Sequence, residues 1–173
     1  MIMPRAAERL LLPANPWFIA FTLFVALLID MVPMGRLAAM PDVLAVVLVF
    51  WGVHQPRRVG VLWAFVFGLF IDVHDGAVLG QHALAYSALS FGAIALHRRM
   101  AWFSLVGQAV QILPLFVAAH VLTLVVRMAV GGMWPGWSVL LVPFLEAALW
   151  PVACVLLLAP QRRAPDRDAH RPL

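Results

Sequence analysis

The sequence has little charge and few reactive side chains. Charged residues make up 12% of the 173 residues, about half the share found in soluble domains, and every basic residue is arginine. The single cysteine, Cys154, excludes an intramolecular disulfide framework and a cysteine-based metal site. Apolar residues make up 64% of the chain, and the mean hydropathy is +0.96. Because so few polar residues could not cover a water-exposed globule, the sequence predicts an integral membrane protein.

The sequence also lacks the motifs of the common enzyme chemistries. It contains no Gly-x-Ser-x-Gly elbow, no phosphate-binding glycine loop and no His-Glu-x-x-His metal motif. Its serines are isolated in apolar runs, where hydroxyl groups usually bond to the preceding helical turn. We therefore expect no catalytic residue, no cofactor and no resident metal ion.

Six apolar segments are spaced along the chain as candidate membrane spans, for which a helix needs about 20 residues. The second and third are short and are separated by Pro56, so a re-entrant hairpin is an alternative to two full crossings. The first is long for a cleaved signal peptide, and no small-x-small cleavage site follows it. The sequence thus predicts an all-α domain over residues 1–160, a six-helix transmembrane bundle with spans at 17–32, 41–55, 59–73, 77–96, 102–130 and 137–159.

The arginines predict the orientation of this bundle. All but two of the 12 arginines lie before the first span, between spans two and three, between spans four and five, or after span six. Short loops rich in arginine stay in the cytoplasm, so six crossings place both termini there. A re-entrant hairpin would instead bring Arg57 and Arg58 to the outer side or bury them. The two exceptions, Arg36 and Arg127, fall on or near the outer side.

The basic balance of the chain does not indicate a nucleic-acid partner. The pI is about 11.0, but the arginines form short clusters between apolar runs rather than one basic face. Residues 161–173 hold four of these arginines and are expected to form a disordered cytoplasmic tail that anchors the topology or contacts anionic lipid.

Four aspartates are expected at one level, near the outer ends of the spans. They support two interpretations. One is a metal or proton site that includes His74 or His82. The other, which we favour, is that they cap helix starts and hold the outer turns together, because acids at an interface cost little. The aspartates are Asp30, Asp42, Asp72 and Asp75.

Glycines accompany the aspartates at the end of the third span. Gly68, Asp72 and Gly76 follow one another at intervals of four, which places them on one face of a helix. Gly76 and Gly80 have the Gly-x-x-x-Gly spacing that lets two backbones approach closely. The segment is expected to form a tight outer turn. The candidate packing or partner-contact residues are Asp42, Gly68, Asp72, Gly76 and Gly80.

Glu146 differs from these aspartates because it is expected about nine residues into the sixth span, near mid-depth. An acid at that depth is costly and should face the bundle interior. His120 in the fifth span is its candidate partner, and Gln108 and Gln111 offer further donors. A proton or substrate site is one reading of this pair. We favour the other, an interhelical hydrogen bond, because a single buried acid is thin support for a transport pathway.

Several segments together resemble MreD, a family of bacterial rod shape-determining membrane proteins. They are Pro41-Asp42 at the start of span two, RRVG at 57–60 and above all GLFIDVHDGAVLGQHAL at 68–84. The resemblance covers the chain except its tail. Asp42, Gly68, Asp72, Gly76 and Gly80 match the family pattern.

The resemblance implies a non-enzymatic scaffold of the cell-elongation complex in the bacterial inner membrane. It implies that the bitopic protein MreC is the main partner and that MreB, RodZ, RodA and its penicillin-binding partner are direct or indirect ones. It further implies a role in lateral peptidoglycan synthesis, and a fold similar to the substrate-binding subunits of energy-coupling-factor transporters.

Two other functions stay open at this point. The first is the substrate-binding subunit of a small-solute, vitamin-type transporter that would use the outer acidic rim. Such subunits often carry an Ala-x-x-x-Ala pattern in their first span. That pattern is absent here, because the residue four positions after Ala20 is Phe24 and the residue four positions after Ala26 is Asp30. The second is a membrane enzyme, which we rank last because no reactive constellation is present.

Overall fold

The computed structural model describes residues 14–32 and 40–161, and these residues are helical, with no strand. The all-α class predicted from the sequence is therefore confirmed for them. Expectations that concern Arg36, residues 1–13 and residues 162–173 lie outside the described residues. The α-helices are α1 (Pro16–Asp30), α2 (Val43–His54), α3 (Val61–His74), α4 (Gln81–Met100), α5 (Leu105–Ala129) and α6 (Val142–Leu158), with short 3-10 helices at Trp137–Leu141 and Ala159–Gln161.

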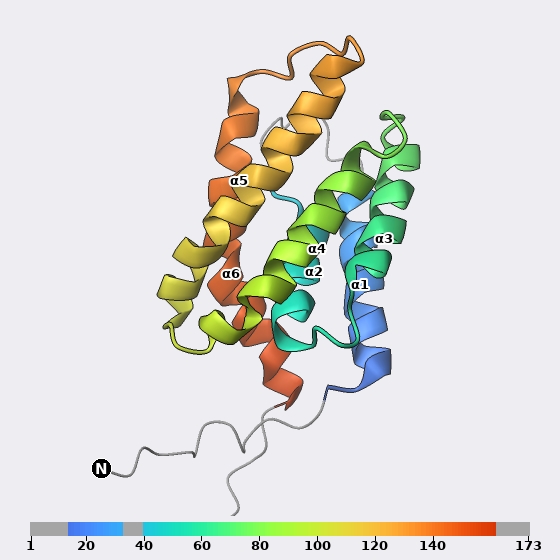
Figure 1. Cartoon of the computed structure of the whole chain (residues 1–173). Coiled ribbons are helices and arrows are strands. Elements are labelled where there is room, and N and C mark those ends of the chain that lie inside the picture. Colours follow the sequence, from blue (N-terminus) through green and yellow to red (C-terminus); the bar gives the residue numbers. More distant parts are fainter. Residues whose placement is uncertain (1–13, 33–39, 162–173) are drawn as a thin grey trace, which may run out of the picture.

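The six α-helices form one bundle in which successive helices run in opposite directions (Figure 1). The central helix is α2, which contacts α1, α4 and α6. Every residue from Leu44 to Val53 is buried, and Phe50 and Trp51 are fully enclosed. Because α2 is apolar on all sides, it has no face suited to water, and the bundle surrounds it with other apolar side chains.

The short length of α2 determines where its ends lie. Its 12 residues span about 18 Å at 1.5 Å per residue, whereas the 25 residues of α5 span about 38 Å. In Figure 1, α5 extends well beyond the start of α2. The first turn of α2 therefore begins inside the bundle, where its backbone N–H groups need partners from the protein.

Each predicted span overlaps one α-helix, and among the helix starts the largest differences are those of α4 and α6, which lie four and five residues later than predicted. The α4 helix begins at Gln81 instead of residue 77, because Gly76 (φ 60) and Gly80 (φ 100) adopt left-handed conformations that end one helix and start the next. The α6 helix begins at Val142, after the 3-10 turn Trp137–Leu141. Glu146 therefore lies in the second turn of α6 rather than near its middle.

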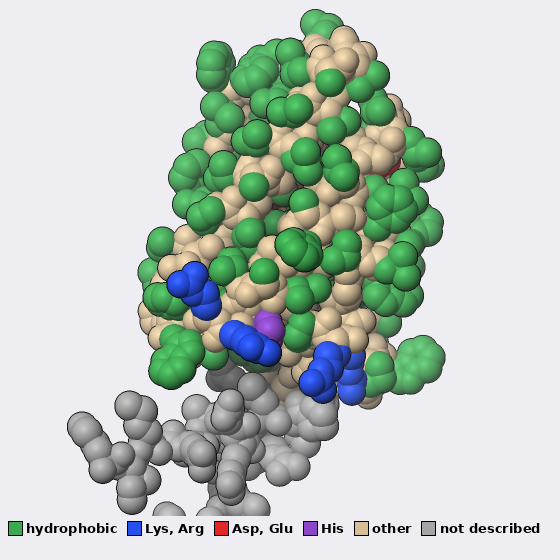
Figure 2. Space-filling view, in the orientation of Figure 1, with side chains coloured by type: hydrophobic (Ala, Val, Ile, Leu, Met, Phe, Trp, Pro, Cys, Tyr) green, Lys and Arg blue, Asp and Glu red, His purple; other side chains and the backbone are tan. Residues whose placement is uncertain are grey.

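The outer surface of the bundle is apolar. Large hydrophobic side chains are exposed on all helices except α2, for example Trp17 at 81% and Phe91 at 68%. Figure 2 shows this apolar cover and a group of arginines at one end, where the α2–α3 and α4–α5 connections lie. By length and composition, Leu105–Ala129 and Trp137–Gln161 are suited to cross a membrane, and α1, α2 and α3 are shorter apolar helices.

Candidate functional site

The start of α2 is held by carboxylate groups from three segments of the chain. A helix leaves its first N–H groups without partners inside the helix. The Val43 N–H donates to Asp30 Oδ1 at 3.1 Å, and the Leu44 N–H to Asp30 Oδ2 at 2.7 Å. The Ala45 N–H donates to Asp42 Oδ1 at 2.7 Å, and the Asp42 N–H to Glu146 Oε1 at 3.2 Å. We call this group of Asp30, Asp42 and Glu146 the α2 carboxylate cap.

The α2 carboxylate cap ties three helices together. Asp30 is the last residue of α1, Asp42 is the N-cap of α2, and Glu146 comes from α6. Four consecutive backbone N–H groups thus receive carboxylate acceptors. The positive end of the helix dipole favours negative charge at this position, so the arrangement suits both the hydrogen bonds and the charge.

Asp72 accepts hydrogen bonds from the backbone N–H groups at the start of α4. Its Oδ2 accepts from the N–H groups of Gly80 at 2.8 Å and Ala83 at 3.3 Å, and its Oδ1 accepts from the His82 N–H at 2.7 Å. The His82 ring nitrogen Nδ1 lies 2.9 Å from the same Oδ1. Asp72 is 1% exposed, so its carboxylate is buried within the turn that it holds.

The two aspartates stand in a short repeated sequence. Leu-x-Ile-Asp occurs at residues 27–30 and again at 69–72, and in each case the aspartate caps the helix that follows. Our sequence analysis placed both aspartates at the outer ends of spans but did not connect them. A search for internal repeats would have found this signal.

The predicted glycines divide into two roles. A Cβ atom added to Gly68 would lie 2.4 Å from Ala83 Cα, so this glycine lets α3 pack directly against the backbone of α4. The Gly68 face is therefore occupied within the chain. Gly76 and Gly80 lie in the α3–α4 turn, and no atom lies within 4 Å of a Cβ added to either. Their spacing does not form a helix-packing face, because α3 ends at His74.

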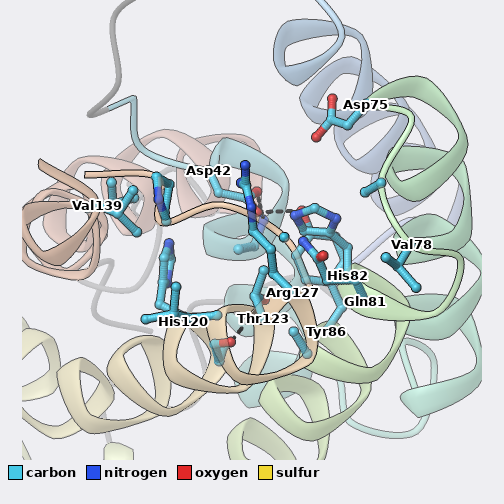
Figure 3. Close-up of a pocket in the computed structure, with 18 of the residues that line it drawn as sticks. Asp42, Asp75, Val78, Gln81, His82, Tyr86, His120, Thr123, Arg127 and Val139 are labelled. Atoms are coloured by element: carbon cyan, nitrogen blue, oxygen red, sulfur yellow. Dashed lines mark hydrogen bonds between the residues drawn. The ribbon is translucent and has the colours of Figure 1, made fainter. Parts of the chain in front are cut away.

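A polar cavity of about 660 Å³ opens beside the α2 carboxylate cap, between α2, α4, α5 and α6. Figure 3 shows that it is lined by Asp42 at the start of α2, by His82 of α4, and by His120 and Arg127 of α5. The Tyr86 hydroxyl donates a hydrogen bond to Asp42 Oδ2. The cavity lies at the end of the bundle opposite the arginine-bearing loops, since α4 starts there and Arg98 and Arg99 lie in its last turn.

Glu146 and His120 come together, as the sequence suggested, with 3.5 Å between Glu146 Oε1 and His120 Nε2. The other ring nitrogen of His120 lies 3.0 Å from the Phe116 carbonyl oxygen. The expected separation of Glu146 from the aspartates is wrong, because Glu146 also accepts from the Asp42 N–H. Sequence reasoning missed this contact because it requires the late start of α6 and the buried start of α2.

Gln108 does not serve Glu146. It accepts from the Trp150 indole at 3.1 Å and donates to the carbonyl oxygens of Met100 and Phe103, and it thereby joins α6 to the α4–α5 connection. Asp75 and His74 are exposed in the α3–α4 turn. Within residues 14–32 and 40–161, no three His, Cys, Asp or Glu side chains are placed to hold a metal ion.

The apolar outer surface and the buried polar end define an integral membrane protein, and comparison with known proteins gives its family. Residues 12–159 match the family model of the rod shape-determining protein MreD, and this chain belongs to that family. The chain is 26% identical over 154 residues to the rod shape-determining protein MreD of Haemophilus influenzae, which covers 85% of this chain and 93% of the relative. No solved structure matches the chain.

The resemblance noted in the sequence is therefore confirmed. The MreD family is known for determining cell shape and is not known as a family of enzymes. Neither match is a transporter subunit, so the comparisons give no support to the solute-binding alternative. The expected similarity to subunits of energy-coupling-factor transporters stays a prediction.

Proposed function

We propose that this protein is a non-enzymatic scaffold of the cell-elongation complex in the bacterial inner membrane, where it binds MreC and helps direct lateral peptidoglycan synthesis. The observation that carries the proposal is the family match, which spans residues 12–159 and so includes all six α-helices. The contacts with MreB, RodZ, RodA and its penicillin-binding partner are direct or pass through MreC.

The proposed topology has six crossings and both termini in the cytoplasm. It is supported by Arg57 and Arg58 in the α2–α3 connection and by Arg98 and Arg99 in the last turn of α4, which lie at one end of the bundle (Figure 1). Arginine-rich short loops are retained in the cytoplasm, so this end faces inward and the polar cavity faces outward. The α2 helix is short, so its start lies below the outer rim of the bundle. At that depth carboxylates, instead of water, accept the hydrogen bonds of its first N–H groups, and this allows the segment to cross the membrane.

The proposed surface for the membrane helix of MreC is an apolar groove between α1 and α3. The groove has a volume of about 750 Å³ and is lined by apolar side chains with Arg58 beside them. Small residues let helices approach closely in lipid, and Ala20 offers such a position between larger neighbours. The lining residues include Trp17, Ala20, Phe21, Phe24, Trp63 and Phe67.

The experiment compares two alanine-to-tryptophan variants in cells depleted of the native protein. Ala20→Trp fills the groove, whereas Ala148→Trp places the same ring on the exposed surface of α6. We expect Ala20→Trp to reduce co-purification of MreC at least about fivefold, since a lost helix contact of about 1 kcal/mol has that effect. Those cells should widen or become round, and Ala148→Trp should keep both MreC binding and the rod shape.

Two results would count against these proposals separately. If Ala20→Trp and Ala148→Trp retain MreC equally, the groove is not the docking surface. If cells without this protein keep their rod shape, the scaffold function itself is wrong.

A further inference from the structure

The polar cavity contains an unused hydrogen-bond acceptor. Glu146 is fully buried and lines the cavity, and its Oε2 has no hydrogen-bond partner in the described part of the chain. Its other oxygen is occupied by the Asp42 N–H. A buried carboxylate oxygen without a donor is costly, so the site favours a bound group that supplies one.

Two other carboxyl groups lie close to this oxygen, and a third lines the cavity. The carboxylates of Asp30 and Asp42 belong to the same cap, and Asp75 lines the cavity from the α3–α4 turn. The facing ionisable groups of α4 are His82 and Tyr86, and those of α5 are His120 and Arg127. Arg127 is exposed, and none of its atoms forms a salt bridge within residues 14–32 and 40–161. The buried side of the cavity therefore favours a group that donates hydrogen bonds over one that only accepts them.

The remaining lining divides into hydrogen-bonding and apolar parts. The Thr123 hydroxyl donates to the Ala119 carbonyl oxygen at 3.1 Å, so its oxygen keeps lone pairs that can accept. Leu89, Phe116 and Val139 form apolar walls. A volume of about 660 Å³ lies within the range of small-ligand sites.

We propose that this cavity binds a primary ammonium group, which donates to Glu146 Oε2 while a short apolar body lies against the hydrophobic wall. An ammonium group has three N–H donors and no acceptor, which matches a site that offers carboxylate and hydroxyl oxygens. The same chemistry could be presented by a free amine or by the ethanolamine headgroup of a membrane lipid. This inference goes beyond the scaffold function and does not depend on it.

The first test uses the full chain in nanodiscs of phosphatidylglycerol. Hexylamine and hexan-1-ol, which share an alkyl chain and differ in the cation, are titrated by calorimetry. We expect hexylamine to bind at least about 10-fold more tightly than the alcohol, because a hydrogen bond to a charged group is stronger than a neutral one. Equal binding of the two would overturn the proposal and leave only an apolar or water-filled cavity.

The second test uses Glu146→Gln, which keeps an oxygen for the Asp42 N–H and replaces the other oxygen by an amide donor. We expect a loss of hexylamine affinity of about 10-fold or more. Ser87→Ala is the control, because the Ser87 hydroxyl bonds to the Ala83 carbonyl oxygen and does not line the cavity. Unchanged hexylamine affinity in a folded Glu146→Gln protein would contradict the assignment, and the comparison of amine with alcohol stands even if this variant does not fold.

A third arm identifies the source of the ammonium group. Half of the phosphatidylglycerol is replaced by phosphatidylethanolamine, and the hexylamine titration is repeated. A competitive loss of affinity assigns the site to the lipid headgroup, and unchanged affinity assigns it to a free amine.

Discussion

The α1–α2 and α3–α4 hairpins differ in how they supply hydrogen-bond acceptors to the first N–H groups of their second helix. In each, an aspartate near the end of the first helix caps the start of the second. Asp72 alone accepts from three N–H groups at the start of α4, those of the N-cap Gly80 and of two residues of the first turn, because the turn is short and Gly68 brings the helices together. The start of α2 lies among α1, α4 and α6, and there three carboxylates accept the hydrogen bonds of the first N–H groups. The α2 start thus uses three acids for four N–H groups, whereas the α4 start uses one acid for three.

The α5–α6 hairpin has no such aspartate. The Ser104 hydroxyl caps α5, and α6 begins without a side-chain cap after its 3-10 turn. Since Glu146 does not cap its own helix, its side chain can accept the hydrogen bond from the Asp42 N–H at the start of α2.

The largest effect is expected for Asp72→Ala. This change removes the acceptor of three backbone N–H groups and of the His82 ring in a buried position. We expect a loss of about 4 kcal/mol in the free energy of unfolding, measured by equilibrium titration in mixed detergent micelles. Asp72→Asn keeps one acceptor oxygen and should lose about half as much, so equal losses in both variants would contradict the capping role.

Gly68→Ala should have the next largest effect. The new Cβ would meet the Ala83 backbone at 2.4 Å, so α3 and α4 must separate, and we expect a loss of about 3 kcal/mol in the same titration. Gly60→Ser is the control, because no atom lies within 4 Å of a Cβ added there. A Gly68→Ala protein as stable as this control would show that the close approach is unimportant.

Asp30→Ala should cost about half as much as Asp72→Ala, about 2 kcal/mol. It leaves two N–H groups of α2 without acceptors, while Asp42 and Glu146 still serve their neighbours. Unfolding titrations of the two variants side by side test this order. A reversed order would mean that the shared cap depends on Asp30 more than its hydrogen bonds indicate.

The smallest effect is expected for Asp75→Asn. Asp75 is exposed in the α3–α4 turn, where losses of charge usually change stability by less than about 0.5 kcal/mol. The unfolding titration should therefore give nearly the native value. A loss comparable to that of Asp72→Ala would remove the distinction between the capping aspartates and their neighbour.

Sequence patterns predicted the helices well because hydropathy and arginine placement are local signals. The residues 41–55 were expected to form a span, and α2 occupies Val43–His54. The starts of α4 and α6 were missed because they depend on backbone conformation at Gly76 and Gly80 and on a 3-10 turn. The contact between Glu146 and Asp42 joins residues 104 positions apart, and only three-dimensional packing reveals it.

Hydrogen exchange at the start of α2 tests the central feature of this molecule most directly. If carboxylates hold this buried helix start, the amides of residues 42–45 exchange slowly in the native protein, and Asp30→Ala selectively speeds exchange at Val43 and Leu44. Fast exchange of all four amides in the native protein, as at an ordinary frayed helix end, would contradict the α2 carboxylate cap.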